Sequence, residues 1–180
     1  MRNLLLDEPA PYKVEETPFG VWRRFSSEQT GFYAEFVSHK RLFGLPLLHY
    51  TRGRSPETGS TRCAVGFVAI GRRAVGVVAI GQLSVGLVAI GQLAIGVMFG
   101  VGQGTTGIVA IGQLAIGLAL GFGQFSTGFV AIGQGAVGFV AIGQGAVGRY
   151  VFATKGIGRH VWDMAGCDPI ARQFFESLIP

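Results

Sequence analysis

Charged residues are missing from the middle of this 180-residue chain: residues 74–148, 75 in all, include no Asp, Glu, Lys, Arg or His. Along that stretch the absence excludes acid–base catalysis and the phosphate contacts of a nucleic-acid-binding protein. The run could supply about three transmembrane helices of about 20 residues each. However, glycine recurs every five residues and no charged loop interrupts the run. Because regularly spaced glycine destabilises helices, we favour strands.

Cysteine and histidine are scarce as well. Cys63 and Cys167 flank the repetitive stretch, and we expect them to lie too far apart for a disulfide, which fits a reducing cytoplasm. The three histidines are His39, His49 and His160. None of them has ligand spacing to another histidine or to a cysteine, so we predict no metal site, no cofactor and no catalytic residue. The first residues include too few apolar side chains for a secretory signal.

Glycine returns every five residues from Gly66 to about Gly158, in units such as Gly-Phe-Val-Ala-Ile at 66–70. A period of five fits neither an α-helix nor a coiled coil. The residues between the glycines are mostly Val, Ile, Leu, Phe and Ala, and β-branched residues favour strands. The pattern predicts short strands joined at glycine-relieved corners and stacked as a β-solenoid.

Two units, 96–101 and 117–122, have six residues instead of five and begin 21 residues apart. If the two irregular units are stacked, four units make one coil. We therefore predict a four-sided solenoid of about 20 residues per coil, with coils at 66–85, 86–106, 107–127 and 128–147 and a partial coil from 148. The bulges at Gly100 and Gly121 would then lie above one another. A flat, two-sided coil of ten residues is the alternative.

Within each unit, position five is almost always Ile or Val, and we expect positions five and three to point inward and position two outward. Position two alternates between large apolar residues and glutamine, which on a four-sided coil gives two opposite apolar walls and two opposite glutamine walls. The apolar set is Phe67, Val77, Leu87, Val97, Ile108, Leu118, Phe129, Phe139. The glutamine set is Gln82, Gln92, Gln103, Gln113, Gln124, Gln134, Gln144.

The five-residue period and its large apolar residue resemble the pentapeptide-repeat proteins over about half of the chain. The resemblance implies a right-handed, four-sided β-helix. This chain has Gly-x-Val-Ala-Ile where that family favours a core of Ala-Asp/Asn-Leu. It also resembles uncharacterised bacterial proteins with Val-Ala-Ile-Gly runs. Neither resemblance supplies site residues.

The solenoid is predicted to occupy 63–162 and to be capped at both ends. Residues 1–62 form an extended arm (1–17) and a small β cap, with strands near 19–25, 31–38 and 42–50. Residues 163–180 form a capping helix that begins at Asp168-Pro169. Its apolar face would lie across the last coil and comprise Ile170, Ala171, Phe174, Phe175, Leu178.

These features predict a non-catalytic scaffold in the cytoplasm, at the inner face of a membrane. It would self-associate or dock on another protein subunit or a lipid bilayer through the apolar walls. Basic residues at the two ends of the uncharged run would contact headgroups or other anions: Arg72, Arg73, Arg149, Lys155, Arg159. Nucleic acid is disfavoured, because basic residues are confined to the ends. The alternatives are an integral or partly embedded membrane protein, and a ligand-binding or enzymatic solenoid with its site at the bulges, near Phe99 and Phe122.

Overall fold

The computed structural model describes residues 11–27 and 31–178. It is mostly β-strand with one short helix, which confirms the all-β prediction. The chain divides into two compact units, Met1–Gln92 and Leu93–Pro180. The first ten residues of the predicted N-terminal arm lie outside the described residues.

The first unit contains an antiparallel sheet of β1 (Lys13–Thr17), β2 (Gly20–Ser27), β3 (Gly31–Ser38) and β6 (Leu48–Gly53). A short hairpin precedes β6, and its two strands, β4 (Arg41–Leu42) and β5 (Leu45–Pro46), have two residues each. β6 then pairs in parallel with the beginning of β7 (Cys63–Asp163). Strands therefore follow the predicted stretches 19–25 and 31–38 closely, whereas 42–50 is broken into shorter pieces.

A buried carboxylate ties this sheet to β7. Glu35 on β3 is 4% exposed. Arg62 Nη1, just before β7, donates to its Oε2 at 2.9 Å, and His49 Nε2 on β6 donates to its Oε1 at 3.2 Å. The backbone N–H of Val65 donates to the other ring nitrogen of His49, Nδ1, at 2.8 Å. Burial alone would raise the pKa of Glu35, but the hydrogen bond from His49 and the charge of Arg62 outweigh it and lower that pKa.

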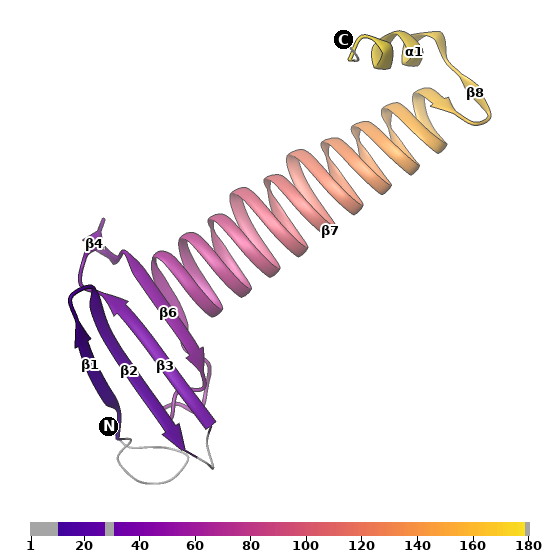
Figure 1. The fold of residues 1–180 in the computed structure, drawn as a ribbon. Coiled ribbons are helices and arrows are strands. Elements are labelled where there is room, and N and C mark those ends of the chain that lie inside the picture. The colour runs from indigo at the N-terminus through magenta and orange to yellow at the C-terminus, as the bar shows by residue number, and fades with distance from the viewer. Residues whose placement is uncertain (1–10, 28–30, 179–180) are drawn as a thin grey trace. The chain divides into compact units, whose positions relative to one another are not determined.

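β7 is a single strand of 101 residues that winds as a coil (Figure 1). A Cβ atom added to Gly133 would overlap the carbonyl oxygen of Gly123, ten residues earlier, and Gly81 has the same relation to Gly71 in the first unit. The rings of Phe129 and Phe139 stack at 4.9 Å. Residues ten apart thus lie in neighbouring turns. The predicted coil of 20 residues with four sides is wrong, and the ten-residue alternative fits.

Glycine recurs in β7 because neighbouring turns approach closely there. Among the described residues, the glycines with positive φ are Gly31, Gly44, Gly53 and Gly59, and all lie outside β7. The repeat glycines therefore keep ordinary extended backbone. Their missing Cβ leaves room for the carbonyl group of the previous turn. The corners expected from glycine's conformational freedom are not the reason for the period.

The interior of each turn is filled by position four. Its alanines are at most 2% exposed: Ala64, Ala69, Ala74, Ala79, Ala89, Ala94, Ala110, Ala115, Ala131, Ala136, Ala141, Ala146. The expectation that positions five and three point inward is wrong, since Ile111 is 41% exposed and Leu114 is 50% exposed. A ten-residue turn encloses too little space for Ile or Leu, and alanine fits.

Three turns carry a hydroxyl in place of an inner alanine. Ser84, Thr105 and Ser126 are at most 3% exposed, and their hydroxyl oxygens have no hydrogen-bond partner. Buried glycines occupy the inner position opposite two of them. A Cβ atom on Gly100 would overlap the Thr105 hydroxyl, and one on Gly121 would overlap the backbone carbonyl of Thr127. At Thr105, the larger inner side chain is therefore matched by the missing side chain of Gly100.

The six-residue units produce two eleven-residue turns, 96–106 and 117–127. In the second, Gly112 and Gly123 are neighbours across eleven residues. A regular turn, 107–116, separates the two. The bulges are therefore two turns apart and not on adjacent coils as predicted.

The second unit ends in β8 (Gly166–Cys167), antiparallel to the end of β7, and α1 (Pro169–Glu176). The predicted helix start is confirmed: Asp168 is the N-cap, and its Oδ1 accepts the N–H of Ile170 at 2.8 Å. Its Oδ2 accepts a hydrogen bond from His160 at 2.9 Å. The cap also fixes the last residues of β7.

α1 packs along the side of successive turns. Ala171 and Phe175 form a cluster with Val140, and Phe174 stacks on Tyr150 at 4.2 Å. Two residues of the predicted apolar face, Ile170 and Leu178, are 51% and 60% exposed. The contact stripe is narrow because positions i, i+3 and i+4 alone face the coil.

Candidate functional site

The outward surface of β7 is the candidate site, and its first feature is an apolar column at position two. In the first unit the column contains Phe67, Val77, Leu87. In the second unit it contains Val97, Ile108, Leu118, Phe129, Phe139, of which Leu118 is 77% exposed. Successive members are ten or eleven residues apart, which is one turn. The residues predicted on two opposite walls therefore share one column in each unit.

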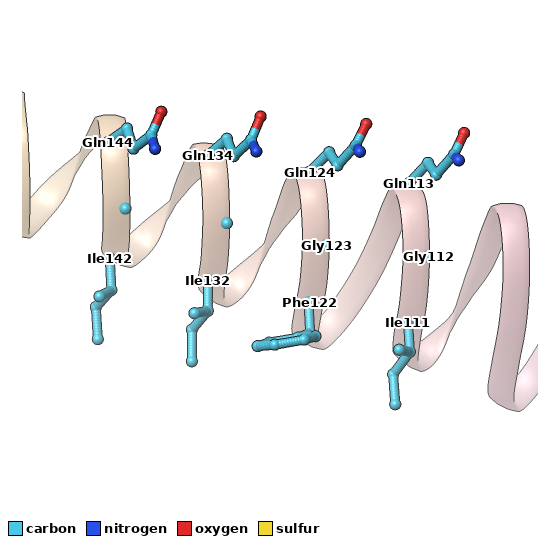
Figure 2. A pocket seen from close by; sticks show the side chains of 12 residues that line it. Ile111, Gly112, Gln113, Phe122, Gly123, Gln124, Ile132, Gln134, Ile142 and Gln144 are labelled. Atoms are coloured by element: carbon cyan, nitrogen blue, oxygen red, sulfur yellow. The ribbon is translucent and has the colours of Figure 1, made fainter.

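A second feature is a groove with a glycine floor, here called the glycine groove. In the second unit it has a volume of 660 Å³ and is lined by Ile111, Gly112, Gln113, Phe122, Gly123, Gln124, Ile132, Gly133, Gln134, Ile142, Gly143, Gln144. Figure 2 shows the glutamines projecting to one side of the floor and the Ile and Phe side chains to the other. A similar groove in the first unit is lined by Ile80, Gly81 and Gln82, among others. The two predicted glutamine walls are one column.

The remaining outward positions are also apolar. Position three of the glutamine units exposes Leu83, Leu93, Leu114, Phe125, and position five of the same units exposes Ile95, Ile116, Val137, Val147. Within residues 74–148, all of which the structure describes, glutamine forms the one polar column that runs through successive turns. Apolar side chains therefore face outward in several directions around each turn.

Basic residues flank these turns. Arg72 and Arg73 are exposed in the first unit, and the Arg72 Nε atom donates to Gln82 Oε1 at 3.0 Å. Arg149, Lys155 and Arg159 are exposed in the second unit. The Arg149 guanidinium lies 5.5 Å from the centre of the Phe139 ring. The predicted anion contacts are thus accessible on the turns next to the uncharged run.

The bulges offer no chemistry of their own. Phe99 and Phe122 are both exposed, and Phe122 belongs to the glycine groove. Within the described residues, no group of three or more His, Cys, Asp or Glu is placed to hold a metal ion. The two cysteines are free thiols. No helix in the described part of the chain is long and apolar enough to cross a membrane.

Sequence reasoning missed the outward Ile and Leu positions. One signal was available: Arg72 and Arg73 occupy positions two and three of the same unit. A charged residue at position three is costly in a packed interior, so Arg73 alone indicates that this position points outward.

Comparisons with known proteins found no matching family model, curated protein or solved structure. The resemblance to pentapeptide-repeat proteins therefore remains a prediction. The ten-residue turn also departs from the four-sided coil that this resemblance implies.

Proposed function

We propose that this protein is a non-catalytic structural module that embeds the uncharged turns of its β-solenoid in a lipid bilayer. The observation that carries the proposal is the distribution of exposed apolar side chains. They occupy the apolar column, the Ile side of the glycine groove and positions three and five of the glutamine units. A protein partner covers one face, whereas apolar surface in several directions favours an apolar medium.

The size of the uncharged region supports this proposal. In the second unit, residues 93–148 amount to five turns of ten or eleven residues. At about 4.8 Å per turn, five turns rise about 24 Å, close to the bilayer's hydrocarbon thickness of about 30 Å. Two further uncharged turns lie in the first unit. Backbone pairing between turns would satisfy the polar groups that a membrane-embedded segment has to satisfy internally.

The basic residues that flank the uncharged turns also support embedding in lipid. Arg72, Arg73, Arg149, Lys155 and Arg159 would reach anionic headgroups beyond the uncharged turns. Each basic residue near such a surface contributes about 1 kcal/mol of attraction.

Self-association is the second candidate function, and the glutamine column favours it. A primary amide is both donor and acceptor, so two copies of this column are complementary to each other. Hydrogen bonds between polar side chains also hold helices together in lipid, where water does not compete. Copies of the chain would therefore pair through glutamine while the other columns face lipid.

The test uses the full chain, lipid vesicles and a matched pair of variants. Val97 in β7 and Val14 in β1 are each 62% exposed. We expect the wild type to float with phosphatidylcholine–phosphatidylglycerol vesicles and to resist carbonate extraction. Val97→Lys should lower the floating fraction severalfold, because a charge within the hydrocarbon costs about 3 kcal/mol, while Val14→Lys should leave it unchanged. Release by salt, or a sharp oligomer soluble without detergent, would refute embedding; the latter would support self-association alone.

A further inference from the structure

One face of the sheet in the first unit has a row of aromatic side chains. The pairing registers place Trp22 opposite Phe36, Phe36 opposite Tyr50 and Tyr50 opposite Ile70. The rings of Trp22 and Phe36 lie 4.9 Å apart, and those of Trp22 and Tyr50 lie 6.0 Å apart. Side chains that are opposite in register share one face of a sheet, so this row is a continuous apolar strip across β2, β3, β6 and the start of β7. Figure 1 shows β2, β3 and β6 side by side.

The next row on the same face carries positive charge. Arg24 lies opposite Ala34, and Ala34 lies opposite Arg52. Because alanine is short, it leaves a gap between the two arginines. The Arg24 guanidinium lies 4.8 Å from the centre of the Trp22 ring and its Nη1 atom lies 3.2 Å from Glu15 Oε2, in an exposed pair. In the described part of the chain, Arg52 forms no ion pair with an acidic residue.

These two rows line a pocket of 690 Å³, which lies within the size range of small-molecule sites. Thr17, Phe19 and Phe32 border it, and both phenylalanines are at least 50% exposed. None of the described residues that line it is acidic. The pocket therefore combines an apolar floor with two guanidinium groups.

We propose that this pocket binds a small amphiphilic anion, with its carboxylate or phosphate between Arg24 and Arg52 and its apolar body on Trp22, Phe36 and Tyr50. Guanidinium forks match the geometry of both anions. Phe36, at 8% exposed, lies at the pocket floor. A small molecule reaches that floor, whereas the surface of a bilayer does not. The proposal concerns residues outside the uncharged turns and does not depend on the function proposed for β7.

The experiment follows the fluorescence of Trp22 in a Trp162→Phe background, which leaves one tryptophan in the chain. Octyl phosphate is titrated below its micelle concentration, with octyltrimethylammonium and octanol as head-group controls. We expect a saturable change with octyl phosphate and a much weaker response to the two controls. Binding of all three with similar affinity would overturn the proposal. So would binding of anionic lipid vesicles without binding of octyl phosphate.

Variants then test the two arginines. Arg24→Gln and Arg52→Gln should each weaken octyl phosphate binding about tenfold, as expected for lost hydrogen bonds to a charged group. Arg23→Gln removes the same charge from the next residue, whose side chain points to the opposite face, and should leave affinity unchanged. Ala34→Leu should block binding by filling the gap. Because Arg24 also pairs with Glu15, Arg24→Gln could lower the Tm of the protein. In that case Arg52→Gln is the decisive variant. Unchanged affinity in a folded Arg52→Gln protein would refute the site.

Discussion

Gly143 lies so close to the carbonyl oxygen of Gly133 that a Cβ atom added to Gly143 would overlap it. The two residues are ten apart in sequence and one turn apart in β7. This contact explains why glycine recurs at all: any other residue would push neighbouring turns apart. The five-residue period thus marks the two places in each ten-residue turn where neighbouring turns approach most closely.

Gly143→Ala is therefore expected to destabilise the second unit strongly, by about 2 kcal/mol or more, since the new methyl group overlaps backbone that cannot rotate away. Gly145→Ala is the matched control, because its nearest neighbour would be the Gln134 carbonyl oxygen at 3.9 Å. Thermal unfolding followed by circular dichroism should give a much lower Tm for Gly143→Ala only. Equal Tm values would contradict the ten-residue turn.

The narrow interior gives a second prediction. Ala131 is fully buried, whereas Ala119 is exposed on the eleven-residue turn. Ala131→Leu should cost about 3 kcal/mol or prevent folding, because overpacking a close-packed interior forces backbone shifts. Ala119→Leu should leave the unfolding free energy within about 0.5 kcal/mol of wild type, as surface changes do. Urea denaturation of both proteins compares them directly, and a tolerated Ala131→Leu would mean that position four points outward.

The unpartnered hydroxyl of Ser126 gives a stabilising prediction. Burying a hydroxyl without a hydrogen bond costs about 1–3 kcal/mol, so Ser126→Ala should raise the unfolding free energy by about 1 kcal/mol. The reciprocal change Ala136→Ser, at the next inner position on the same side, should lower it by a similar amount. A drop in Tm for Ser126→Ala would show that the hydroxyl has a partner.

Acid should weaken the first unit through Glu35. Its pKa is lowered from the ordinary 4.5, because the hydrogen bond from His49 and the charge of Arg62 outweigh burial. A carboxyl group whose pKa is lower in the folded state stabilises the fold at any pH above its pKa in the unfolded state. That contribution is lost as the pH falls through its pKa in the folded state. We expect the Tm to fall between pH 5 and the lowered folded pKa. Glu35→Gln should have a lower Tm at pH 7 and a flatter profile; an unchanged profile would exclude Glu35 as the cause.

Base should act on the same unit through Tyr33. Burial, with the nearby Glu35 charge, raises the pKa of the Tyr33 hydroxyl from 10.0 to about 12. A raised phenol pKa stabilises the fold below pH 10, and that contribution disappears as the pH rises through 12. Ultraviolet titration at 295 nm should show a late-titrating tyrosine that is absent from Tyr33→Phe. Retention of that late component would assign it elsewhere.

Several features were predictable from sequence because local chemistry determines them. The glycine period excluded long helices, and the Asp168-Pro169 pair identified the start of α1. The outward direction of position two was also predictable, since glutamine alternates there with large apolar residues. These features depend on one residue type at one position.

The turn length and the site were not predictable in the same way. Ten and twenty are both whole multiples of the five-residue unit, so the repeat is compatible with either turn length. The 21-residue spacing of the two six-residue units is also compatible with both. What separates the two turn lengths is which residues lie in neighbouring turns, and the close approach of Gly133 to the Gly123 carbonyl oxygen shows that residues ten apart do. The arginine pair around Ala34 depends on strand register between β2, β3 and β6, which the sequence of each strand leaves open.

Spin labels on three outward columns test most directly whether β7 faces lipid in several directions. Single cysteines would replace Leu118, Phe125 or Val137 in a Cys63→Ser, Cys167→Ser background, in protein reconstituted into vesicles. We predict that labels at all three sites collide readily with oxygen, which concentrates in hydrocarbon, and rarely with a water-soluble nickel complex. Ready collision with nickel at all three sites, or protection of a single column by a protein contact, would contradict the account.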